Sequence, residues 1–331
     1  MMRRLTNAWP LALALLAASG ARAEPPSDPA SIVTLSDENA SITPNHLSDR
    51  NYVNGLRLGY TSGTGQVPGF LSRLDHVVWG DGQQRIAFDL SQQIYTPANT
   101  QLAIPDPRER PYAGVLLANL SLLNDTDNSR GVIGLSVGIV GPGAGGEELQ
   151  NGFHDIIGQG HDFGWSHQIQ NTFAFEALAE RTWRYPIAQF GGLETDVLPA
   201  ATIGVGDLRD YVQLGATFRI GQGLASDFGV SRVRPGLSGS DAFTPVRPFA
   251  WYAFAGVDGQ AVGYDLLLES GPFRGGPHVT PVRDVGEFQG GLAVMAFGAR
   301  LTYTQIVQTQ EFRHQHGGLH QLGALTLSVR F

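Results

Sequence analysis

His154 is the residue of this sequence best placed for acid–base chemistry. It lies in residues 147–157, where apolar side chains recur at helical spacing before Gly158, a residue that commonly ends a helix. Gln150 precedes His154 by four residues, so both side chains share one face of the expected helix. A His in such a place can act as a general base near neutral pH, and the alternative is a surface His beside Asp155. We therefore look for chemistry first on this helix.

Two other motifs carry less weight. Residues 134–138 match the G-x-S-x-G pattern of a nucleophilic Ser, but they lie within an expected strand and lack the strand–turn–helix context. His314 and His316 alternate along the chain without a third ligand at a familiar metal spacing. The sequence has no Cys, and its 22 basic residues are all Arg. This excludes thiol catalysis, a Walker A loop and a Schiff-base lysine, and the residues alone identify no metal.

The N-terminal residues predict export. Arg3 and Arg4 precede an apolar run over residues 11–18, and a small-x-small pattern ends at Ala23. This is the form of a secretory signal peptide over residues 1–23, and the apolar run is too short to span a membrane. No later segment approaches the ~20 consecutive apolar residues of a membrane helix. A net charge of -8 also argues against a nucleic-acid partner.

The chain after residue 23 has the pattern of a β-barrel. At its end, Leu325, Leu327, Val329 and Phe331 alternate with small or polar residues, which is the lipid-out, lumen-in code of a transmembrane strand. A soluble β-sandwich is the alternative for this strand alone. The same alternation predicts strands over residues 52–61, 86–94, 133–139, 172–180, 202–207, 211–220, 249–257, 290–297 and 299–306.

We therefore predict an all-β fold for residues 24–331. It is a transmembrane, antiparallel, up-and-down β-barrel of about 12 strands, given ~10 residues per strand plus a turn. The expected location is the bacterial outer membrane. The short helix that carries His154 is expected at the barrel wall.

Several short segments, taken together and in order, resemble one family. They are Glu38-Asn39 with residues 48–58, Ile94-Tyr95-Thr96-Pro97, residues 109–114, residues 141–158 and Glu311-Phe312. These are similar to the "END … DR-x-YTNG", "IYTP", "DRPYAG", "GP-x-A-GG-x-x-x-QN-x-x-H-x-x-IG" and "EF" motifs of the outer-membrane lipid A 3'-O-deacylases. The resemblance extends from about residue 32 to the end of the chain.

The resemblance implies a fold and an activity. Members are twelve-stranded barrels that remove the 3'-acyloxyacyl chain from lipid A, the membrane anchor of lipopolysaccharide, by calcium-assisted ester hydrolysis. His154 would activate a water molecule, and a metal with amide donors would stabilise the oxyanion. Gln150 and Asn39 fall on site positions of the family.

This sequence also departs from the family pattern. Ala40 stands where the family has Asp, Val53 replaces a Thr, and Gly160 replaces an acid. Loss of Asp at position 40 removes a charged oxygen of the kind that Ca²⁺ prefers. Asp37 is expected on the opposite strand face from position 40, because the two lie three residues apart.

Three functions therefore compete. The first is an outer-membrane esterase acting on lipid A. The second is a non-catalytic barrel of the same fold, either a structural relic or a passive pore. A phospholipase of the Ser-His type is the third and is disfavoured.

Overall fold

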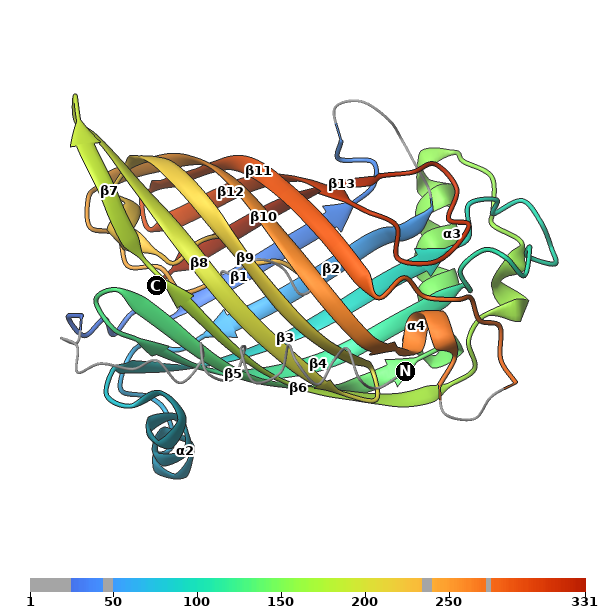
Figure 1. The fold of residues 1–331 in the computed structure, drawn as a ribbon, viewed down its shortest axis with the longest axis horizontal. Helices are drawn as coiled ribbons and strands as arrows, with labels where there is room; N and C mark the ends of the chain where they lie inside the picture. Colours follow the sequence, from blue (N-terminus) through green and yellow to red (C-terminus); the bar gives the residue numbers. More distant parts are fainter. Residues whose placement is uncertain (1–24, 44–49, 234–239, 272–274) are drawn as a thin grey trace.

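The computed structural model describes residues 25–43, 50–233, 240–271 and 275–331. Within them the chain forms one antiparallel sheet that closes into a barrel (Figure 1). The expected signal peptide, residues 1–23, lies outside the described residues. None of the helices in the described ranges is long and apolar enough to span a membrane.

The barrel wall contains twelve strands, and β7 is an additional short strand. Strands β1 and β13 pair at one closing seam, β6 and β8 pair at the other, and β7 extends the sheet on β8 beyond the closed wall. The predicted antiparallel up-and-down barrel is therefore confirmed. The strands are β1 (Ile32–Asn39), β2 (Asn51–Thr61), β3 (Gln83–Thr96), β4 (Ala113–Asp125), β5 (Ser129–Val140), β6 (Thr172–Trp183), β7 (Tyr185–Phe190), β8 (Leu193–Gly206), β9 (Arg209–Gln222), β10 (Phe249–Asp265), β11 (Asp284–Ala296), β12 (Ala299–Gln308) and β13 (His320–Arg330).

Short helices lie at the two ends of the barrel. Helix α2 (Gly69–Trp79) lies outside the wall at the end that holds the termini of the barrel, β1 at Ile32 and β13 at Arg330. Helices α3 (Gly146–Ile157) and α4 (Leu266–Glu269) lie at the opposite end (Figure 1). Three short 3₁₀ helices are also present in the described residues: η2 (Pro142–Ala144), η3 (Gly164–His167) and η4 (Leu224–Ser226).

The two faces of the wall differ as the alternation predicts. On β13 the side chains of Leu325, Leu327 and Val329 are exposed on the outer face, while Thr326 and Ser328 are buried in the lumen. Burying polar side chains inside and exposing aliphatic ones outside is stable only where lipid is the surrounding solvent. The outer face of the barrel is therefore a lipid-facing surface.

The connection between β9 and β10 enters the lumen. Near the termini, Asp227 is buried between Arg219, at 2.6 Å, and Arg300, at 2.9 Å. Closer to the α3 end, Arg232 bridges Glu38 of β1, at 2.7 Å, to Glu287 of β11, at 2.6 Å. The described part of this connection thus occupies space that a passive pore would leave open.

The buried carboxylate of Asp227 gives a testable stability effect. Burial alone would raise its pKa, but Arg300 and Arg219 outweigh burial and hold the pKa below its ordinary 3.8. The stabilisation is therefore present above pH 3.8 and is lost as the pH falls further. We expect Asp227→Asn to lower the free energy of unfolding by about 1.5–3 kcal/mol at pH 7, because two guanidinium groups lose a charged acceptor.

Urea unfolding of the barrel in lipid vesicles, followed by Trp fluorescence, measures this effect. Asp127→Asn is the matched control, since Asp127 is exposed in the turn after β4, and it should change stability by less than about 0.5 kcal/mol. Equal stabilities of the two variants at pH 7 would show that the lumen ion pairs do not hold the barrel together.

Candidate functional site

Glycine residues and an aromatic pair dock the start of α3 on the wall. A Cβ atom on Gly146 would lie 2.9 Å from the Cα of Gly114 in β4 and 3.0 Å from the ring of Trp165. Trp165 packs against Tyr112 with ring centroids 4.8 Å apart and the ring planes tilted by 46°. The backbone of α3 can approach the wall this closely only without side chains at the contact. These close contacts therefore place the helix.

Helix α3 turns its polar side to the protein. Gln150 and His154 are only 4% and 6% exposed, whereas Phe153 and Ile156 on the other side are 52% and 82% exposed. A helix on a water-soluble protein shows the reverse arrangement. The two polar candidates are thus held against the wall, and the apolar side faces outward in the same way as the lipid-facing aliphatic residues of the barrel.

The loop after α3 orients His154. Gly158 ends the helix in the left-handed conformation with φ 72°, and the chain returns so that the carbonyl of Gly160 lies 2.9 Å from Nδ1 of His154. A carbonyl only accepts hydrogen bonds, so Nδ1 carries the proton and Nε2 of a neutral ring keeps the lone pair. A backbone carbonyl, that of Gly160, therefore orients the ring of His154.

Contacts on the far side of Gly160 fix this loop. The N–H of Asp162 donates to Oδ1 of Asn151 at 2.9 Å, and Nδ2 of Asn151 donates to the carbonyl of Asp162 at 3.3 Å. Burial raises the pKa of the Asp162 carboxyl, while a hydrogen bond from Thr100 and the nearby His154 act in the opposite direction. The loop is thus tied to α3 on both sides of the carbonyl that orients His154.

The predicted site residues line one cavity. It measures about 260 Å³ and lies between α3 and the outer face of β1, β2 and β3. Asn39 reaches it from the end of β1, while Gln150 and His154 reach it from α3. The sequence placed Gln150 beside His154, but only the fold brings Asn39 to them. The remaining lining residues are Asp37, Ala40, Ser41, Val53, Asn54, Leu56, Ile94, Leu149, Phe153, Ile157 and Gln159.

Two side-chain amides can donate hydrogen bonds into this cavity. Oδ1 of Asn39 accepts from the backbone N–H of Ser41 at 2.7 Å and from its hydroxyl group, which leaves the Nδ2 group as the donor. Both polar atoms of the Gln150 amide are buried without a hydrogen-bond partner in the structure. A buried amide without a partner is costly, and a ligand that enters the cavity would satisfy this one.

Asp37 also lines the cavity, and sequence reasoning missed it. Its Oδ1 accepts a hydrogen bond from Nδ2 of Asn54 at 3.1 Å, and its side chain is half-buried. The expectation that Asp37 lies away from position 40 was wrong, because β1 ends at Asn39 and the turn at Ala40 returns to the same cavity. A signal was present: Asp37 precedes Asn39 by two residues and so shares its strand face.

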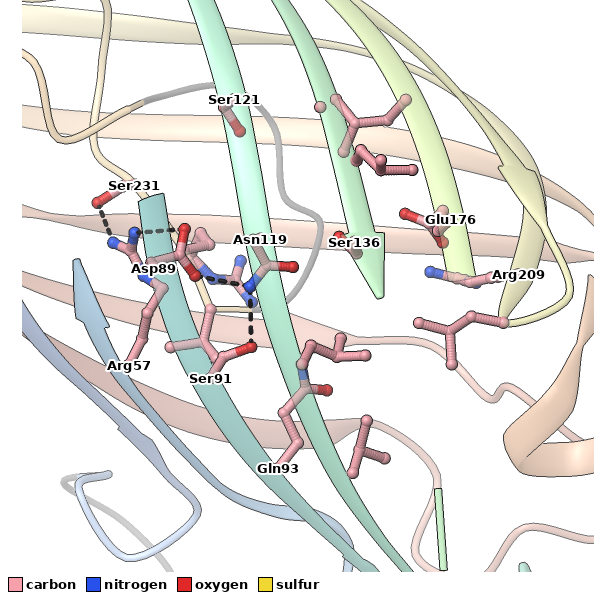
Figure 2. Close-up of a pocket in the computed structure, with 18 of the residues that line it drawn as sticks. Arg57, Asp89, Ser91, Gln93, Asn119, Ser121, Ser136, Glu176, Arg209 and Ser231 are labelled. Atoms are coloured by element: carbon pink, nitrogen blue, oxygen red, sulfur yellow. Dashed lines mark hydrogen bonds and ion pairs between the residues drawn. The ribbon is translucent and has the colours of Figure 1, made fainter. Parts of the chain in front are cut away.

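A second cavity lies inside the lumen and contains none of the predicted site residues. It measures about 220 Å³, and Figure 2 shows its polar lining. There Arg57 pairs with Asp241 at 2.7 Å, and Asn119 donates to Asp89 at 2.6 Å. Ser136 of the G-x-S-x-G match also faces this cavity from the middle of β5. It is therefore a lumen residue on a strand, without the turn of a nucleophilic Ser.

The remaining motif residues hold loops together at the α3 end. Arg110 forms a buried ion pair with Glu311 at 3.0 Å and lies over the ring of Tyr95 at 4.5 Å. His316 contacts Glu109 at 3.2 Å. Within the described ranges, no group of three or more His, Cys, Asp or Glu residues could hold a metal ion. His316 therefore contributes to the loop contacts at this end.

The closed barrel, with its aliphatic outer face, defines a β-barrel of the outer-membrane type, with its candidate site between a helix and the lipid-facing wall. A family model described as outer membrane protein LpxR matches residues 9–331, and the chain belongs to this family. The predicted outer-membrane location is thereby confirmed.

A solved structure shares this fold. LpxR from Salmonella typhimurium superimposes with a TM-score of 0.75 at 22% sequence identity, covering 91% of this chain and 100% of that one. The beta domain of the Bordetella autotransporter Brka gives 0.43 at 8% identity, over 92% and 98% of the two chains. A search of curated proteins found no match.

Proposed function

We propose that this protein is an esterase of the outer membrane that removes the 3'-acyloxyacyl chain from lipid A. The observation that carries the proposal is the convergence of His154, Gln150 and Asn39 on one cavity of the lipid-facing wall. A general base and two amide donors in one cavity are the components that ester hydrolysis requires.

The position of the cavity suits this substrate. In outer-membrane barrels the termini and the turns next to them face the periplasm, and α3 lies at the opposite end (Figure 1). The cavity is therefore at the level of the outer leaflet, which contains lipid A. The exposed apolar side of α3, with Phe153 and Ile156, would contact the acyl chains of the same leaflet.

The proposed reaction is attack of water on the ester carbonyl. Nε2 of His154 takes a proton from water while the water oxygen bonds to the carbonyl carbon. Nε2–H of Gln150 and Nδ2–H of Asn39 donate to the oxyanion. The bond between that carbon and the 3-hydroxyl oxygen of the sugar then breaks, and His154 returns the proton to this oxygen. The products are a free acyloxyacyl acid and a sugar hydroxyl.

Calcium, which the resemblance implies, does not fit these residues well. Ca²⁺ takes about 6–8 oxygen ligands and favours several carboxylates. Among the residues that line the cavity, Asp37 is the one carboxylate, and Ala40 supplies no side-chain oxygen. We therefore assign no step of the reaction to a metal ion.

Asp37 is proposed to supply the negative charge of the site. Its carboxylate lines the cavity with His154 and would stabilise the imidazolium that forms as the base takes up a proton. We expect Asp37→Asn to lower kcat roughly tenfold, the order expected for removal of one nearby charge, with KM nearly unchanged. Steady-state kinetics in mixed micelles measure this, and equal kcat values would remove Asp37 from the mechanism.

A direct assay tests the proposed function. Purified protein is incubated with lipid A in detergent, and the products are analysed by mass spectrometry. The proposal predicts one lost mass, that of the 3'-acyloxyacyl group, and an equivalent amount of free acid. The alternative of a non-catalytic barrel predicts unchanged lipid A.

A further inference from the structure

Helix α2, at the end of the barrel opposite the candidate site, has its apolar side turned away from the protein. Phe70, Leu74, Val77 and Val78 recur at positions i, i+4, i+7 and i+8, and they are 74%, 48%, 81% and 44% exposed. Side chains at this spacing lie on one face of a helix. An exposed face of four large apolar residues on an 11-residue helix is unfavourable in water.

The polar side of α2 is fixed on the outer wall. Oδ2 of Asp75 accepts hydrogen bonds from Nε2 of Gln84 in β3 and Nδ2 of Asn124 in β4, both at 2.7 Å. Ser72 also bonds to Gln84 through its hydroxyl group. Asp75 is 0% exposed. The orientation of the helix is therefore set by buried polar contacts with the wall, and the apolar side points away from it.

Trp79 completes the attachment by covering a charge. The ring of Trp79 lies 5.2 Å from the guanidinium of Arg181, a residue of β6 that is only 1% exposed. The same ring packs closely on Gly131 of β5, where a Cβ atom would lie 2.6 Å from it. Arg181 also donates to Ser129 at 2.8 Å. A charged group on the lipid-facing wall is expensive, and α2 shields this one from the surroundings.

The apolar side of α2 is continuous with the lipid-facing surface of the barrel. Gln84, which holds Asp75, precedes Phe88 and Leu90 on the same outer face of β3, and these are 48% and 49% exposed. On β5, Gly131 under Trp79 precedes Leu135 on the same face, which is 46% exposed. The established lipid-facing surface thus begins within a few residues of the helix contact.

We propose that α2 lies within the periplasmic leaflet of the outer membrane and that its occupant is the phospholipid acyl-chain layer, which contacts Phe70, Leu74, Val77 and Val78. Arg73 and His76, exposed between the apolar face and the wall, would reach the headgroups. The helix forms an in-plane anchor at the periplasmic end and covers polar wall residues that lipid could not solvate. This inference is independent of catalysis.

Depth-dependent quenching tests the proposal, and the absence of native Cys allows single-site labelling. Val77→Cys carries an environment-sensitive fluorophore, and the full barrel is reconstituted in phosphatidylcholine–phosphatidylglycerol vesicles with nitroxide-labelled acyl chains. Leu58→Cys, at a 57% exposed position on the outer face of β2, is the lipid-facing reference. Asp127→Cys, in the exposed turn after β4, is the aqueous reference. Phe70→Cys provides a second position on α2.

We expect quenching at positions 77 and 70 to be within about twofold of that at position 58 and several-fold greater than that at position 127. Quenching at both α2 positions no greater than at position 127 would overturn the proposal, whether water or a second copy of the chain covers the face. A heat-modifiable gel shift confirms that each labelled barrel is folded.

Discussion

His154→Ala is expected to lower kcat for release of the acyloxyacyl chain by about 10²–10⁴-fold, the usual contribution of a positioned general base. The reason is geometric. The carbonyl of Gly160 holds Nδ1 at 2.9 Å, so the ring presents Nε2 for proton transfer, and His154 lines the cavity together with both amide donors. Mass spectrometry of the released acid, measured over time in mixed micelles, gives the rates.

His161→Ala is the control for this variant. His161 lies on the same loop, is half-exposed, and pairs with Asp155 at 2.7 Å outside the cavity. Its removal should change kcat by less than about threefold, because an exposed ion pair contributes little. Equal losses in the two variants would mean that the loop matters only as a structure. Full activity of His154→Ala would remove the base from the mechanism.

Gln150→Leu is expected to separate catalysis from stability. Both polar atoms of the Gln150 amide are buried without a partner, so replacement by an apolar side chain of similar size removes a desolvation cost. We expect the free energy of unfolding to stay equal or to rise. We expect kcat to fall by about 10²–10³-fold, the effect of losing one oxyanion donor.

Two measurements on one preparation show whether the Gln150 amide acts in catalysis or in stability. Urea unfolding in vesicles gives the stability, and the acid-release assay gives kcat. Gln159→Ala is the control, because Gln159 lines the same cavity but is exposed, and it should alter neither quantity markedly. A Gln150→Leu barrel that is destabilised by several kcal/mol, or that keeps full activity, would show that this amide is structural.

The barrel was largely predictable because lipid imposes a simple code on each strand. Residues 325–331 alternate cleanly, and β13 has the faces that this pattern predicts. Three strands were missed: β1, β4 and the short additional strand β7. β4 is apolar on both faces, with Leu116 outside and Leu117 in the lumen, so its alternation is weak. On the outer face of β1, the apolar Leu35 is followed by the charged Asp37 where the strand reaches the candidate site, so the apolar pattern stops there.

The candidate site was predictable only in part. Local spacing related Gln150 to His154, because both lie on one helix face. No local pattern could bring Asn39 to them, since closure of the barrel and docking of α3 through Gly146 place Asn39 in the same cavity as the helix residues. Asp37 and the Gly160 carbonyl were not predicted, because one depends on where β1 ends and the other belongs to the backbone.

The central claim is that the cavity beneath α3 hydrolyses the 3'-ester of lipid A. The most direct test is to express the chain and its His154→Ala variant in a Gram-negative host whose lipid A is fully acylated, and to compare the lipid A by mass spectrometry at matched outer-membrane levels. We expect the native chain to convert lipid A to the species lacking the 3'-acyloxyacyl group, and the variant to leave lipid A unchanged. Lipid A that keeps this group with the native chain, or loses it equally with both, would contradict the claim.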